Sequence, residues 1–187
     1  MRLDRLLLAG FGVLGLGSFE APAHTMTRDE LRGLSAEGAR QRDAGNAGEA
    51  LSTAERVYQA AEASLPPGDT DLLTYMSNFA FMLEAAGRPA EAEPLFVESL
   101  KRLKETKPAG DTMVVATMDH LGQFFANQGR DAEAEPLLVE ALALRRETLG
   151  SEHRDTLASI NSLGTLYWRN GRYAEAEPLY REAADTW

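Results

Sequence analysis

A short segment that returns every 42 residues constrains the fold of this chain more than any other feature. The sequence Ala-Glu-Ala-Glu-Pro-Leu begins at Ala90, Ala132 and Ala174, and a Gly-Arg pair stands just before it each time. Forty-two residues before the first of these pairs lies Gly45, which a degenerate copy of the segment follows. Repetition at such a period is typical of stacked supersecondary units that contact only their neighbours. We therefore expect four units rather than one globular core.

Each unit divides at its glycine into two helical runs. In the last unit the first run covers 155–170, and its apolar residues recur three or four positions apart, as on one face of a helix. Those residues are Leu157, Ile160, Leu163, Gly164 and Tyr167, and the second run, from Ala174, carries Ala176, Leu179, Tyr180 and Ala183 at similar spacing. Gly171 favours a left-handed end to the first helix. Because one helix pair cannot bury its apolar face alone, the units must stack on one another.

The glutamates and the proline of the repeated segment are expected at the start of each second helix. There the helix dipole favours negative charge, and the proline costs little if it falls among the first N–H groups, which have no acceptor within the helix. Paired carboxylates can also act as a catalytic acid and base. The return of the pairs Glu91/Glu93, Glu133/Glu135 and Glu175/Glu177 in every unit favours a structural role instead.

The order of large and small residues in these units resembles the tetratricopeptide repeat. The matching positions are Leu163, Gly164, Tyr167, Gly171, Ala176, Tyr180 and Ala183; then Leu121, Gly122, Phe125, Gly129, Ala134, Leu138 and Ala141; and more loosely Phe79, Ala80, Leu83, Gly87, Ala92, Phe96 and Ser99. The period of 42 residues, the Gly-Arg-x-Ala-Glu-Ala-Glu-Pro-Leu core and the linker 149–157 resemble the kinesin-light-chain type. This resemblance implies an all-α, right-handed α-α superhelix of about four helix pairs, with approximate repeats 29–64, 71–106, 113–148 and 155–187. Unit one lacks apolar anchors at Glu37 and Gln41, so we interpret it as a polar N-terminal cap.

The resemblance also implies where a ligand would bind. In this family the first helix of each pair lines a concave groove, and its polar residues hold a peptide. Carried over position by position, the groove residues are Asn78, Phe81, Asp119, His120, Gln123, Asn127, Asn161, Thr165, Trp168 and Arg169, with Thr74, Ser77 and Glu84 beside them. Trp168 and Arg169 are the leading hot-spot candidates, because Trp and Arg carry much of the energy at interfaces. Trp168 packing against a following helix is the alternative.

Composition and motifs favour a non-catalytic scaffold that binds a protein partner. The formal net charge of −10 argues against nucleic acid and is compatible with a basic peptide. The chain has no cysteine, which excludes thiolate catalysis and Cys-based metal sites. His120 and His153 are too far apart to suggest a metal pair, and His153 is expected to cap or pack near a helix start. No phosphate loop, nucleophile elbow or HExxH pattern occurs, so no cofactor is expected.

Residues 1–23 have the features of a secretory signal. Arg2 and Arg5 precede a short apolar stretch, and Ala21-Pro22-Ala23 provides small residues for cleavage. The stretch is short and glycine-rich for a membrane span, so no stable membrane insertion is expected after cleavage. We therefore expect export to a periplasmic or secreted location. An uncleaved anchor and a disordered cytoplasmic extension are the alternatives.

The sequence ends at Trp187, inside the expected second helix of unit four. An end without a capping helix should expose apolar surface, including Leu166, Leu179 and Ala183 or their neighbours. Two further functions follow as alternatives to a scaffold. The chain could be the recognition module of a larger enzyme such as a protease, or a structural protein that self-associates through its C-terminal end.

Overall fold

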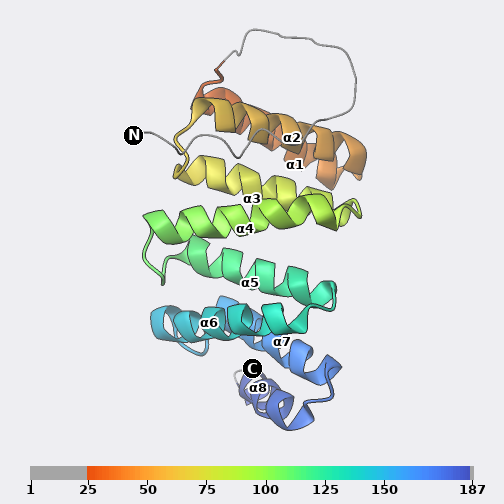
Figure 1. The fold of residues 1–187 in the computed structure, drawn as a ribbon, viewed down its shortest axis with the longest axis vertical. Helices are drawn as coiled ribbons and strands as arrows, with labels where there is room; N and C mark the ends of the chain where they lie inside the picture. Colours follow the sequence, from red (N-terminus) through yellow and green to blue (C-terminus); the bar gives the residue numbers. More distant parts are fainter. Residues whose placement is uncertain (1–24, 186–187) are drawn as a thin grey trace, which may run out of the picture.

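The computed structural model describes residues 25–185, which form eight helices and no strand. The expected signal at 1–23 lies outside the described residues. The helices are Arg28–Asp43 (α1), Ala47–Ser64 (α2), Thr70–Ala85 (α3), Pro89–Thr106 (α4), Thr112–Asn127 (α5), Asp131–Leu149 (α6), Arg154–Arg169 (α7) and Tyr173–Asp185 (α8). They stack as four antiparallel pairs in chain order, with α1 and α2 at one end and α8 at the other (Figure 1). The expected all-α solenoid is confirmed.

Each helix packs on the next one along the chain, so the apolar seam runs through the stack. One core cluster extends from α3 to α8, and it contains most residues of the repeat pattern in units two and three, including Phe79, Phe96 and Leu121. Phe96, Leu138 and Ile160 are fully buried within it. Helix α5 also contacts α7, the first helix of the next unit. The first helices therefore lie on the inner side of the stack at this point.

The repeat glycines end the first helices, as the sequence predicts. Gly45, Gly87, Gly129 and Gly171 have φ between 72° and 81°, a left-handed conformation that only glycine adopts without strain. At the other end, the side chains of Asp69, Asp111 and His153 accept the backbone N–H two residues ahead and cap α3, α5 and α7. The expectation that His153 caps a helix start is confirmed.

The repeat prolines lie deeper in the second helices than expected. Pro94 is the sixth residue of α4, and Pro136 and Pro178 hold the same place in α6 and α8. The first helical bond of α4 already runs from Ala92 N to Arg88 O at 3.3 Å. A residue at position 94 is thus past the N–H groups that have no acceptor, and the proline removes one regular helical bond in each unit. The expectation that the prolines fall among the N–H groups without an acceptor was wrong.

The arginine of the Gly-Arg pair joins unit two to unit three and unit three to unit four. Arg130 donates to Glu133 of its own unit at 2.7 Å and to Glu93 of the preceding unit at 2.6 Å, and its guanidinium lies 4.3 Å from the centroid of the Phe125 ring. The corresponding contacts of Arg172 are with Glu175 at 2.5 Å, Glu135 at 2.6 Å and the Tyr167 ring at 4.2 Å. The repeated segment therefore encodes an inter-unit clamp.

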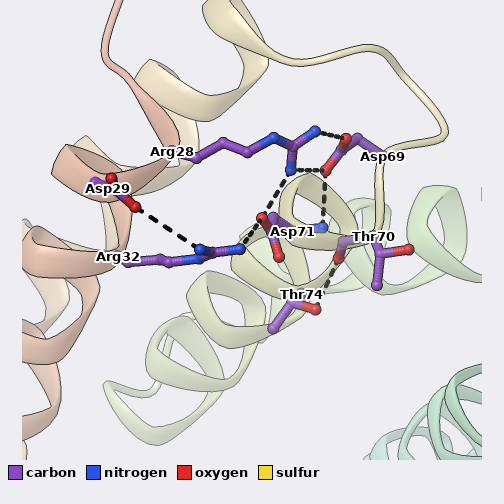
Figure 2. Close-up of polar contacts among 7 residues, drawn as sticks. All are labelled: Arg28, Asp29, Arg32, Asp69, Thr70, Asp71 and Thr74. Atoms are coloured by element: carbon purple, nitrogen blue, oxygen red, sulfur yellow. Dashed lines mark hydrogen bonds and ion pairs between the residues drawn. The ribbon is translucent and has the colours of Figure 1, made fainter.

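Unit one is attached by a different set of ion pairs. Arg28, at the start of α1, donates to Asp71 at 2.8 Å and also to Asp69, the residue that caps α3 (Figure 2). Arg32 reaches Asp71 at 3.5 Å. Helix α1 buries only Leu31, which belongs to a small second cluster with residues of α2 and α3. This polar exterior agrees with the interpretation of unit one as a cap.

Candidate peptide-binding surface on the first helices

All ten predicted site residues lie on first helices, on α3, α5 or α7. We call their exposed side, together with Thr74, the first-helix face. Eight of the ten are exposed: Asn78, His120, Gln123, Asn127, Asn161, Thr165, Trp168 and Arg169. Phe81 is half-buried and Asp119 is buried. Nine of these residues are thus exposed or half-buried on α3, α5 and α7.

Contacts between neighbouring first helices make this face continuous. The rings of Phe81 and His120 meet edge to face, with centroids 4.6 Å apart. The Asn127 amide donates to Glu84 at 3.5 Å, and Arg169 donates to the carbonyl of Ala126 at 3.1 Å. These contacts fix the positions of side chains from three units relative to one another.

Three carboxamides of the face are available for a ligand. Within residues 25–185, the side chains of Asn78, Gln123 and Asn161 make no hydrogen bond to protein, and each is exposed. Asn78 belongs to α3, Gln123 to α5 and Asn161 to α7. A carboxamide both donates and accepts, which matches the N–H and C=O groups of a peptide backbone.

Asp119 is engaged inside the stack. Its Oδ2 accepts hydrogen bonds from Arg145 of α6 and, at 2.7 Å, from Ser159 of α7. Burial raises the pKa of the Asp119 carboxyl, and the hydrogen bond from Ser159 and the charge of Arg145 offset this in part. Only 3% of Asp119 is exposed, so it does not present its carboxylate on the first-helix face.

His120, next in the chain, is exposed but packs its ring on Phe81. Desolvation lowers the pKa of His120, and the charge of Asp119 opposes this shift. The imidazole is therefore neutral at pH 7, with one nitrogen as donor and the other as acceptor.

Trp168 is 58% exposed and forms an aromatic pair with Tyr173, which is 60% exposed, with ring centroids 6.4 Å apart. Tyr173 was not among the predicted site residues, although its position beside the Gly-Arg turn could have suggested it. Of the residues expected to be exposed at the C-terminal end, Leu166 and Ala183 are buried and Leu179 is half-buried, whereas Tyr180, next to Leu179, is exposed. Leu166 stands in the repeat position of Phe124, whose ring packs on Phe96 of the preceding unit, so this position faces back into the stack.

Sequence reasoning placed no candidate on α1, yet the structure has a hollow there. It has a volume of about 360 Å³ and lies between α1, α2 and α3, with Asn78 and Phe81 at its border. The sequence does contain a signal for this hollow, because Ala39 and Ala54 are small residues at the positions that Phe81 and Phe96 occupy in unit two.

The repeated glutamates do not form a paired-carboxylate site. Glu91, Glu133 and Glu175 each bind the arginine three residues before them, while Glu93 and Glu135 bind the arginine of the next unit. Between residues 25 and 185, no group of three or more His, Asp or Glu side chains is placed to hold a metal ion. None of the helices in this range is long and apolar enough to cross a membrane.

Comparison with known proteins agrees with this architecture. Sequence models of the tetratricopeptide repeat family match residues 72–106 and 114–187. None of the curated proteins compared with the chain matches it.

Solved structures give the same fold. A putative kinesin light chain from Podosopora anserina with nearly identical TPR-like repeats is 26% identical, with a TM-score of 0.76 over 88% of this chain and 75% of that one. BtubC (BKLC) from P. vanneervenii is 18% identical, with a TM-score of 0.78 over 87% of this chain and 65% of that one. A Rap protein complexed with Competence and Sporulation Factor is 16% identical, with a TM-score of 0.69 over 86% of this chain and 44% of that one. The chain belongs to the tetratricopeptide repeat family, which is generally a non-catalytic protein-interaction fold, and is of the kinesin-light-chain-like type.

Proposed function

We propose that this protein is a non-catalytic scaffold that binds an extended peptide segment of a partner protein along its first-helix face. The observation that carries the proposal is an exposed carboxamide on each of α3, α5 and α7, at Asn78, Gln123 and Asn161, none of which has a hydrogen-bond partner in the described part of the chain. Trp168, also on α7, provides a large exposed apolar surface. Interface energy is concentrated in such aromatic side chains, while amides supply direction and register.

The charges on this face do not favour a strongly basic peptide. Of the three charged side chains at the candidate positions, Glu84 bonds to Asn127, Asp119 is buried with Arg145, and Arg169 is exposed. Many of the acidic side chains lie on the second helices instead, where several pair with arginines. We therefore propose a partner segment that is neutral or weakly charged and rich in backbone hydrogen-bonding capacity. An exported location fits such a scaffold and remains part of the proposal.

A peptide-display selection on the full chain tests the function. Twelve-residue peptides recovered by the selection are labelled, and their binding is measured by fluorescence polarisation. We expect the triple variant Asn78→Ala/Gln123→Ala/Asn161→Ala to bind at least tenfold more weakly, since a hydrogen bond contributes about 0.5–1.5 kcal/mol and a factor of ten is about 1.4 kcal/mol. We also expect Trp168→Ala to weaken binding.

The matched control is Glu105→Ala/Glu147→Ala, which changes exposed residues at the ends of the second helices α4 and α6. This control should bind as the unchanged protein does. Equal binding by the triple variant and the control would show that the first-helix face is not the binding surface.

A further inference from the structure

The hollow between α1, α2 and α3 is a pre-formed cavity with mainly apolar walls. Its volume is about 360 Å³, within the range of sites that hold small molecules. The apolar wall includes Gly38, Ala39, Ala50, Ala54 and Val57. Thr53 also lines it, but its hydroxyl already donates to Gln41 at 2.7 Å. Most of this lining therefore offers no hydrogen bond to a guest.

The internal repeat shows what is missing from the cavity. In units two and three, Phe81, Phe96 and Phe124 form a ring cluster, with centroids 5.1 Å apart for Phe81–Phe96 and 5.5 Å apart for Phe96–Phe124. The residues 42 positions earlier are Ala39, Ala54 and Met82, and all three line the cavity. Unit one thus lacks two phenyl rings at the place where unit two has them. An aromatic guest would supply the rings that unit one lacks.

Physical precedent supports an aromatic guest in such a space. An apolar cavity of about 150 Å³ stays dry and binds benzene. A cavity of about 360 Å³ is large enough for two fused rings. Phe81, at its border, can add an edge-to-face contact with such a ring system.

The charge at the cavity favours an acid. Among the described residues that line it, Arg42 is the one with a charged side chain. Its Nε and Nη2 donate to Asp43 at 3.2 and 3.1 Å, but the two side chains are 62% and 71% exposed. An ion pair this exposed is weak, so a carboxylate held by the cavity can compete for the guanidinium. The free amide of Asn78 also lines the cavity and can donate a second hydrogen bond.

From these observations we infer that the α1–α3 cavity is a binding site for a small aromatic monocarboxylic acid with a fused two-ring body. The rings fill the space between Ala39 and Ala54, and the carboxylate pairs with Arg42. This site shares Asn78 and Phe81 with the first-helix face but excludes the carboxamides of α5 and α7, and the inference does not depend on peptide binding.

Titration of the full chain with 2-naphthylacetate, by calorimetry and by amide NMR, tests the site. We expect saturable one-to-one binding, with shifts confined to residues around Gly38, Ala54 and Met82. Ala54→Phe introduces the side chain found at this position in unit two and should weaken binding at least tenfold. Ala39→Met fills less of the cavity and should also weaken binding. Because the NMR mapping uses the unchanged protein, the test does not depend on either variant folding.

Charge recognition has its own control. Arg42→Met should weaken binding of 2-naphthylacetate while leaving the neutral 2-naphthylethanol unaffected, and Arg40→Met, on the same helix but outside the cavity, should change neither. Absence of saturable binding, or shifts spread over α5 and α7, would overturn the inference. Binding of an aromatic, acidic peptide without binding of the free acid would also overturn it and would assign the cavity to the peptide.

Discussion

At the scale of single residues, the buried pair of Asp119 and Arg145 is the least expected feature of the stack. The side chain of Arg145 is 12% exposed, and its Nη1 donates to Asp119, to Ser159 and to the carbonyl of Asp155. The raised pKa of Asp119 indicates that desolvation destabilises its carboxylate more than the contacts with Ser159 and Arg145 stabilise it. Such a pair contributes little net stability, yet losing one partner leaves an uncompensated group in the interior.

Unit two shows which residues can replace this pair, because Ser77 stands at the position of Asp119 and Leu103 at the position of Arg145. We predict that Asp119→Ser or Arg145→Leu alone destabilises the fold by about 3 kcal/mol, and that the double variant returns to within about 1 kcal/mol of the unchanged protein. Urea denaturation at pH 7 measures all three. In Arg145→Leu the folded-state pKa of Asp119 stays above its unfolded value, so stability should fall as the pH rises through that interval. Additive losses in the double variant would show that the pair does not act as a unit.

The positions of most site residues could be predicted from sequence, because helical spacing fixes which side of a helix faces out. Asn78 and Gln123 are exposed, as a solvent-facing helical position requires. Asn161 is exposed too, although Asp119 at the same repeat position is buried. The burial of Asp119 could not be predicted. Its burial depends on Arg145, which reaches it from another helix, and on Ser159 in the next unit. Contacts between residues that lie 26 and 40 positions apart in the sequence leave no local pattern.

At the scale of helices and turns, the clamp formed by the Gly-Arg arginines explains why the repeated segment carries two glutamates. The first glutamate binds the arginine of its own unit and the second binds the arginine of the next unit, so each plays a different role. The hydrogen bonds from Arg172 lower the pKa of both Glu135 and Glu175. Arg88 lacks the second contact, because Leu51 stands where the preceding unit would need a glutamate.

This difference provides an internal control. We predict that Arg130→Ala and Arg172→Ala lower the urea midpoint, and that Arg88→Ala lowers it less, since Arg88 has neither the inter-unit glutamate nor an aromatic ring beneath it. Because the pKa values of Glu133, Glu135 and Glu175 are lowered, the effect should be complete above the unfolded glutamate pKa of about 4.3 and should disappear as the pH falls through the folded values. Equal effects for all three variants would contradict the inter-unit role.

The helices themselves follow closely from local signals. The first helix of unit four was predicted at 155–170 and is Arg154–Arg169, because Gly171 and the His153 cap fix its two ends. The position of the prolines within the second helices was harder to predict, since it depends on which residue begins each of those helices. That start is set by the Arg88 carbonyl, which accepts from both Glu91 and Ala92. The hollow beside α1 needed a comparison between units that single-helix patterns do not provide.

At the scale of the whole molecule, stability is distributed unevenly along the stack. The main cluster joins α3 to α8, whereas Leu31, Val57, Ala61, Leu72 and Tyr75 form a separate, smaller cluster. Unit one has no Gly-Arg clamp and borders the unfilled cavity. In a linear array each unit is stabilised by its own folding and by its neighbours, so an end unit with few apolar contacts opens first.

Native-state hydrogen exchange can detect this gradient. We predict that interior amides of α5 are protected about a hundredfold more than those of α1, because α1 opens in a local step while α5 opens only with the main cluster. Arg28→Ala removes the ion pairs with Asp69 and Asp71 and should speed exchange in α1 without changing α5 or α7. Arg154→Ala, at the same repeat position in unit four, is the control and should leave α1 unchanged. Uniform protection from α1 to α7 would mean that the two clusters unfold as one, and the cavity would then lie within the most stable part of the molecule rather than at its labile end.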